Sequence, residues 1–185
     1  MYVCGVTVYD LAHIGHARTF ISFDVIARYL RAVGYDLTFV RNHTDVDDKI
    51  IKRANETDQD PIALAEHFIE ALDEDVGALG VCHADHEPKV SEHIDTIISL
   101  INRLIERDVA YAVEGGDVFY RVTRFDEYGK LSGQRVENLR AGERIATDPR
   151  KEHPADFALW KASKDGEPAW ESPWGAGRPG WHIEC

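Results

Sequence analysis

The first forty residues read as a strand, a turn, a helix and a second strand, and this pattern limits the fold more than any other feature. Apolar residues within 2–8 predict a buried strand, and apolar residues recur every three or four positions between Gly15 and Val33. Gly34 follows as a natural helix terminator, and a second strand is predicted over 35–41. Because strand–helix–strand crossovers are right-handed and join parallel strands, the sequence predicts an α/β fold with a parallel sheet.

The middle of the chain is predicted to be mainly helical. Apolar stripes and start signals predict helices over 47–55, 60–80 and 87–105, the first opened by a capping box at 44–47. A small hairpin is expected over 111–122, around two adjacent glycines. The polar stretch that follows it predicts an irregular insertion rather than core.

Both ends of the chain resemble core strands. Residues 2–8 and 181–185 are rich in apolar and β-branched side chains. We therefore expect the two segments to be neighbouring parallel strands, and the chain to be a fragment of a longer protein. A short natural protein is the alternative.

The charge balance argues against one broad class of function. The chain has 33 acidic and 21 basic residues, a formal net charge of −12. Proteins that bind nucleic acid over a wide surface usually carry a basic excess that neutralises phosphates, so bulk nucleic-acid binding is disfavoured. A local anion site remains possible, because backbone N–H groups at a helix N-terminus bind phosphate regardless of the overall charge.

The cysteine count and the hydropathy indicate the compartment. Cys4, Cys82 and Cys185 are too few for a disulfide framework, and an odd number favours reduced thiols or metal ligands, although their spacing alone identifies no zinc site. No apolar run approaches the ~18–20 residues of a membrane span, and the start lacks a secretory leader. We expect a cytoplasmic protein without a membrane partner.

A pair of histidines at the start of the first helix is the sharpest chemical feature. His13-Ile14-Gly15-His16 places two imidazoles on one side of a helix N-terminus, where a phosphate would be favoured, and Gly15 lets a ligand approach the backbone. One alternative is that one histidine caps the helix and the other is a surface residue. Metal binding by this pair is a further alternative, but the sequence offers no additional ligands nearby.

A cluster of three aspartates has a structural interpretation. Asp45, Asp47 and Asp48 could hold magnesium or calcium, but the EF-hand pattern fails because Ile50 stands where its glycine should be. Acidic residues are also favoured in the first turn of a helix by the helix dipole. The structural interpretation is therefore preferred.

Four blocks of the sequence resemble the cysteinyl-tRNA synthetase family, whose members are class I aminoacyl-tRNA synthetases. They are residues 4–10 (CGVTVYD), 12–18 (AHIGHAR), 41–50 (RNHTDVDDKI) and 172–185 (SPWGAGRPGWHIEC). The second block contains the HIGH signature of class I synthetases, and the other three are specific to the cysteine enzymes. The resemblance runs from one end of the chain to the other.

The resemblance implies a fold and an activity. The fold would be the first half of a Rossmann-type catalytic domain, with a parallel sheet and a mainly helical connective insertion. Residues 1–55 would begin the nucleotide-binding domain, 56–155 would hold the helical segment and insertion, and 156–185 would return to the catalytic sheet, truncated at its end. The complete protein would use ATP, with Mg²⁺, to convert cysteine into cysteinyl-adenylate and then transfer the cysteinyl group to tRNA(Cys) in translation. It would be a monomer, and this fragment would be inactive alone.

The resemblance also assigns individual residues. The catalytic and ATP-binding residues would be His13 and His16, with Gly15 also contacting ATP. The cysteine substrate would be bound by Gly5, Thr7, Thr44 and Trp181. Two of the family's four zinc ligands would be Cys4 and Cys185. Because cysteine and serine have nearly the same shape, a soft metal that binds the substrate thiolate separates them better than a cavity does.

Two other functions remain as alternatives. One is the related ligase that joins cysteine to an aminosugar in mycothiol synthesis, and the other is a noncatalytic nucleotide-binding fragment. Cysteine-dependent pyrophosphate exchange separates the noncatalytic fragment from both enzymes. Charging of tRNA separates the two enzymes from each other.

Overall fold

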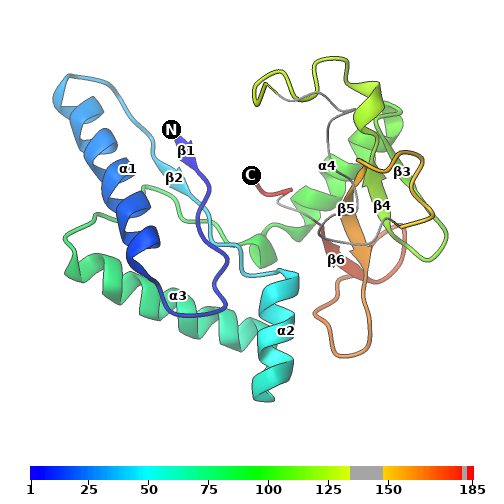
Figure 1. Cartoon of the computed structure of the whole chain (residues 1–185), viewed down its shortest axis with the longest axis horizontal. Coiled ribbons are helices and arrows are strands. Elements are labelled where there is room, and N and C mark those ends of the chain that lie inside the picture. The colour runs from blue at the N-terminus through cyan, green and yellow to red at the C-terminus, as the bar shows by residue number, and fades with distance from the viewer. Residues whose placement is uncertain (134–147, 181–182) are drawn as a thin grey trace. The chain divides into compact units, whose positions relative to one another are not determined.

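A computed structural model describes residues 1–133, 148–180 and 183–185 (Figure 1). The chain forms two compact units, one of Met1–His93 with Glu184–Cys185 and one of Ile94–Ile183. The first unit contains β1 (Tyr2–Val3), α1 (Ile14–Ala32), β2 (Val40–Arg41), α2 (Asp48–Thr57), α3 (Pro61–Ala78) and the 3₁₀ helix η1 (Val90–Glu92). The second contains α4 (Ile94–Glu106), β3 (Ala110–Ala112), β4 (Val118–Tyr120), the 3₁₀ helix η2 (Val122–Arg124), β5 (Phe157–Ala162) and β6 (Gly177–Pro179).

The parallel strands of the first unit confirm the strand–helix–strand prediction. β1 pairs with β2 in parallel, with Tyr2 opposite Val40 (Figure 1), and Thr7 and Thr44 form a further parallel bridge. Both strands are shorter than predicted. The ladder is interrupted because the N–H of Gly5 donates to the side chain of Asn42 rather than to a strand backbone. The fold is therefore α/β and of the Rossmann type, as expected.

The helices of the first unit enclose its core. α1 ends before Gly34, which has φ +94°, and α3 begins with Pro61 behind the N-cap Asp60. The predicted capping box at 44–47 is wrong: Asp47 is itself the N-cap of α2 and accepts from the N–H of Lys49 at 2.8 Å. The core cluster consists of Val8, Phe20, Ile50, Ala54, Leu64, Ala65, Phe68, Ile69, Leu72, Val76 and Val81.

The second unit is built on an antiparallel sheet in the order β3-β4-β5-β6. The β3–β4 pairing confirms the predicted hairpin, with Tyr111 opposite Phe119. Asp156, which is buried, accepts from the hydroxyl of Tyr111 and the N–H groups of Val122 and His153. This carboxylate ties the segment before β5 to β3 and to the start of η2.

The last part of the chain differs from the predicted strand over 181–185. Residues 183 and 184 form a turn, and 181–182 lie outside the described residues. The strand in this part of the chain is instead β6. Its sequence, Gly-Arg-Pro, did not predict a strand because glycine and proline are depleted in strands. β5 and β6 pair within the antiparallel sheet. Of the residues described after β6, Glu184 and Cys185 belong to the first unit with the parallel strands. The predicted segments 1–55, 56–155 and 156–185 follow a functional division and stay a prediction.

None of the described helices is both long enough and apolar enough to cross a membrane.

Candidate active site

The two histidines cap the start of α1 reciprocally. Nδ1 of His13, the N-cap residue, accepts from the N–H of Gly15 at 3.1 Å, and Nδ1 of His16 accepts from the N–H of His13 at 3.2 Å. The rings are stacked, with centroids 4.0 Å apart and planes 15° apart. The sequence alternatives, a capping role and a ligand-facing role, are therefore compatible, since capping uses only one nitrogen of each ring.

The capping geometry fixes what the other ring nitrogens can do. A neutral imidazole whose Nδ1 accepts a hydrogen bond carries its proton on Nε2. Burial first, and then the charge of His13, lower the pKa of His16 below its ordinary value, so His16 is neutral at pH 7. Its Nε2 is a hydrogen-bond donor at a helix N-terminus, where the dipole also favours an anion.

The thiols of Cys4 and Cys185 lie close together although they come from opposite ends of the sequence. The residue Cys185 is exposed, but partial burial of its thiol, a hydrogen bond with Cys4 and the charges of Glu184 and Cys4 raise its pKa to about 12. The Cys185 thiol also lies 3.9 Å from Oδ1 of Asn42. This arrangement places two sulfur atoms that could both bind one metal ion next to each other in the first unit.

Asn42 and Glu184 hold these two segments in place. Asn42 is 2% exposed, and its Oδ1 accepts from the N–H of Gly5 at 2.9 Å. Its Nδ2 faces Oγ1 of Thr44 at 3.3 Å and Oε1 of Glu184 at 3.4 Å. Thr44 Oγ1 donates to the same Glu184 oxygen at 2.8 Å. These bonds to the carboxylate, together with the hydroxyl of Tyr2, which donates to the backbone oxygen of Glu184 at 3.1 Å, attach the last two residues to the parallel strands.

The predicted cysteine-binding residues lie around this network. Thr7 and Thr44 are partners in an isolated parallel bridge beyond the ends of β1 and β2. A Cβ at Gly5 would lie 1.8 Å from the carbonyl oxygen of Asn42, so only glycine fits there. The prediction for Trp181 falls outside the described residues. The structure thus brings Cys4, Gly5, Thr7, Thr44 and Cys185 together within the first unit, which also contains His13, Gly15 and His16.

The aspartate cluster is used structurally where its contacts are described. Asp45 accepts from both the N–H and the hydroxyl of Ser91, and Asp47 caps α2. Asn42 and Glu184 are the site residues that sequence reasoning missed. Both lie in the blocks that carry the family resemblance, but nothing in the pattern indicates that they contact each other across 142 positions.

Comparisons with known proteins agree on one family. The family described as tRNA synthetases class I (C) catalytic domain matches residues 1–185. A cysteine–tRNA ligase of Thioalkalivibrio sulfidiphilus is 59% identical over 185 residues, which are 100% of this chain and 40% of that protein. The cysteine–tRNA ligase of Alkalilimnicola ehrlichii is 60% identical with the same coverage. Arabidopsis thaliana cysteine–tRNA ligase 2, cytoplasmic, is also 60% identical, with 36% of that protein covered.

A solved structure supports the fold. A LeuRS from Agrobacterium radiobacter, in a ternary complex with tRNA and LeuAMS, matches with a TM-score of 0.54 and 19% identity. That match covers 60% of this chain and 15% of the LeuRS. The chain spans 40% of the length of two of the curated relatives that it matches. The match over all 185 residues nevertheless shows that the chain belongs to the family of class I (C) tRNA synthetase catalytic domains.

Proposed function

We propose that this chain is part of a cysteine–tRNA ligase, which activates cysteine with ATP and transfers the cysteinyl group to tRNA(Cys). The observation that carries the proposal is the pairing of Cys4 with Cys185 beside Thr7 and Thr44, in the unit whose helix α1 begins with two stacked histidines. A pair of thiols that could hold a soft metal ion suits a thiol substrate, and the helix start suits a polyphosphate. The relatives' names give the same activity.

The two chemical steps assign a role to the helix start. In the first step, a carboxylate oxygen of cysteine attacks the α-phosphorus of ATP and pyrophosphate leaves. In the second, a terminal ribose hydroxyl of the tRNA attacks the carbonyl of the adenylate and AMP leaves. The Nε2 donors of His13 and His16, together with the helix N-terminus, would stabilise the negative charge that develops on the phosphates in the first step. ATP would enter with Mg²⁺.

The thiol pair also fits the zinc ion that the family uses. Two sulfurs that face each other are unfavourable as two thiolates, and a bound cation would remove that repulsion. Cys4 and Cys185 would supply two of four ligands. A bound zinc would favour the ionised thiol of the substrate and discriminate against serine. Thr44 would be held beside the thiol pair by Glu184.

The experiment compares full-length proteins that differ at the start of α1. His16→Gln keeps an acceptor at the third position of the capping box but removes the imidazole. We expect kcat for cysteine-dependent pyrophosphate exchange to fall about 100-fold with little change in KM for cysteine, as when one transition-state donor is removed. His67→Gln, an exposed position on α3, is the matched control and should retain the parental rate.

Three assays separate the alternatives. Pyrophosphate exchange without tRNA charging would favour the aminosugar ligase, and absence of both from the full-length protein would refute the proposal. Unchanged exchange in His16→Gln would remove His16 from the mechanism. A monomeric state and a cytoplasmic location are further predictions, to be tested by light scattering and cell fractionation.

A further inference from the structure

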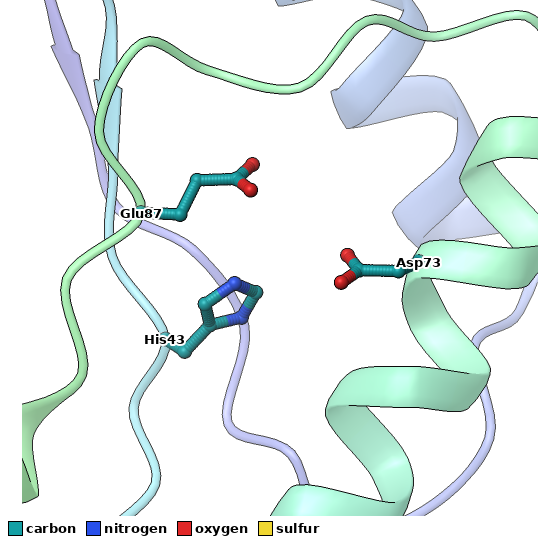
Figure 2. A group of neighbouring side chains, drawn as sticks. All are labelled: His43, Asp73 and Glu87. Carbon is teal, nitrogen blue, oxygen red and sulfur yellow. The ribbon is translucent and has the colours of Figure 1, made fainter.

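A second group of side chains that could hold a metal ion lies in the first unit and includes neither thiol. His43 follows β2, Asp73 lies on α3 and Glu87 precedes η1. One ligand atom from each of the three lies within 4.8 Å of the other two. Figure 2 shows the ring of His43 and both carboxylates directed toward one another.

Two atoms of this cluster are buried without a hydrogen-bond partner. His43 is 3% exposed, and its Nδ1 has no partner among the residues that the structure describes. The same holds for Oδ1 of Asp73 within the described part of the chain. A buried polar atom left unsatisfied costs about 1–3 kcal/mol, so native proteins rarely keep two side by side. A ligand that satisfies both atoms at once would remove this cost.

The charges around the cluster favour a cation as that ligand. Glu87 is paired with Arg41 and Lys89 is paired with Glu66, so these four groups balance. Asp73 then adds a negative charge that neither pair neutralises. Glu87 also contacts His83 at 2.9 Å, but each carboxylate oxygen has two lone pairs and can accept from a second partner.

We propose that His43, Asp73 and Glu87 bind a divalent first-row transition ion, with Zn²⁺ as the best match to the donors. An imidazole with carboxylates suits zinc, whereas sites for magnesium and calcium are made of oxygen atoms alone. The ligand atoms of a tetrahedral site with ~2.1 Å bonds lie ~3.4 Å apart, so side-chain rotations that draw together three atoms already within 4.8 Å of one another would complete the site. The ion would join the β2 edge, α3 and the segment before η1 into one body.

The test separates this site from the thiol pair. In a chain with Cys4→Ser, Cys82→Ser and Cys185→Ser, zinc is titrated against a chromogenic chelator and bound zinc is measured after equilibrium dialysis. We expect one saturable equivalent per chain. Asp73→Asn in this background should weaken zinc binding at least tenfold, because it removes the carboxylate and nearly conserves its shape. Asp75→Asn, an exposed position on the same helix, is the matched control and should bind as the parent does.

A thermal measurement distinguishes a ligand from a merely structural residue. Zinc should raise the melting temperature of the cysteine-free chain and of Asp75→Asn, but not that of Asp73→Asn. With a chelator present, Asp73→Asn should melt no lower than the parent, because it replaces a carboxylate whose buried Oδ1 has no hydrogen-bond partner among the described residues. His43→Gln repeats the comparison if Asp73→Asn does not fold. No saturable equivalent in the cysteine-free chain, or equal binding by Asp73→Asn and Asp75→Asn, would overturn the proposal.

Discussion

Replacing Asn42 with aspartate should separate the two thiols without altering either one. In the structure, Nδ2 of Asn42 faces Oε1 of Glu184 at 3.4 Å, while Oδ1 accepts from Gly5. Asn42→Asp keeps the acceptor for Gly5 but turns the donor into a second carboxylate oxygen facing Glu184. The substitution therefore acts on the attachment of Glu184 and Cys185 to the strand edge.

The magnitude follows from the distance. Two unit charges 3.4 Å apart repel by ~5 kcal/mol at an effective dielectric constant of ~20, which is an upper bound because the partly exposed Glu184 can turn toward water. The lost hydrogen bond adds about 1 kcal/mol. We expect about 2 kcal/mol in total, after Glu184 relaxes, which corresponds to about a 30-fold smaller population with Cys185 held beside Cys4.

Cross-linking with a short bifunctional thiol reagent measures that population directly. In a Cys82→Ser background only Cys4 and Cys185 remain, so intramolecular cross-linking reports their proximity. The rate should fall about 30-fold in Asn42→Asp, in line with 2 kcal/mol. Asn55→Asp makes the same chemical change at an exposed position on α2 and should cross-link at the parental rate. Equal rates in the two variants would refute the role given to Asn42.

Three further expectations concern stability. His13→Ala removes the N-cap of α1 and should lower the free energy of unfolding in urea by about 1 kcal/mol, whereas His13→Ser should restore most of it. Asp156→Ala leaves the hydroxyl of Tyr111, the buried N–H of Val122 and the partly buried N–H of His153 without their acceptor, and calorimetry should show a loss of about 3 kcal/mol. Burial raises the pKa of Glu167, but the hydrogen bond and charge of Arg178 outweigh it and the net pKa lies below the ordinary 4.5. Its stabilising contribution is therefore present above pH ~4.5 and is lost as the pH falls through the lower, folded-state pKa; Glu167→Gln should flatten this part of the stability curve.

Local patterns predicted the elements whose signals are local. The spacing of its apolar residues predicted the helix α1, which ends before Gly34 as expected. The Asp60-Pro61 pair predicted the start of α3. The extent of strands was predicted less well, because pairing depends on partners. Gly5 gives its N–H to the Asn42 side chain and ends the regular ladder, which no alternation of residues could reveal.

The strand β6 shows the opposite failure. Gly177–Pro179 has poor strand propensity, yet it pairs with β5. A Cβ at Gly177 would lie 2.3 Å from Nε1 of the buried Trp160, so the glycine is required by the close approach of that ring. Propensity is overridden here by packing, as is usual for strands whose environment is set by their neighbours.

The candidate site was predictable only as a set of residue types. The family resemblance selects Cys4, Thr44 and Cys185, but it does not explain how positions 140 or more apart come to meet. The structure supplies the explanation. The carboxylate of Glu184 accepts hydrogen bonds from Thr44 and Asn42, and the Oδ1 of Asn42 accepts a hydrogen bond from the N–H of Gly5. One buried amide and one carboxylate thus connect the segments around Gly5, Asn42 and Glu184. Because these bonds form only when the parallel strands are paired, the thiol pair is a property of the folded first unit, and any change that unpairs β1 from β2 should abolish it as completely as loss of a cysteine.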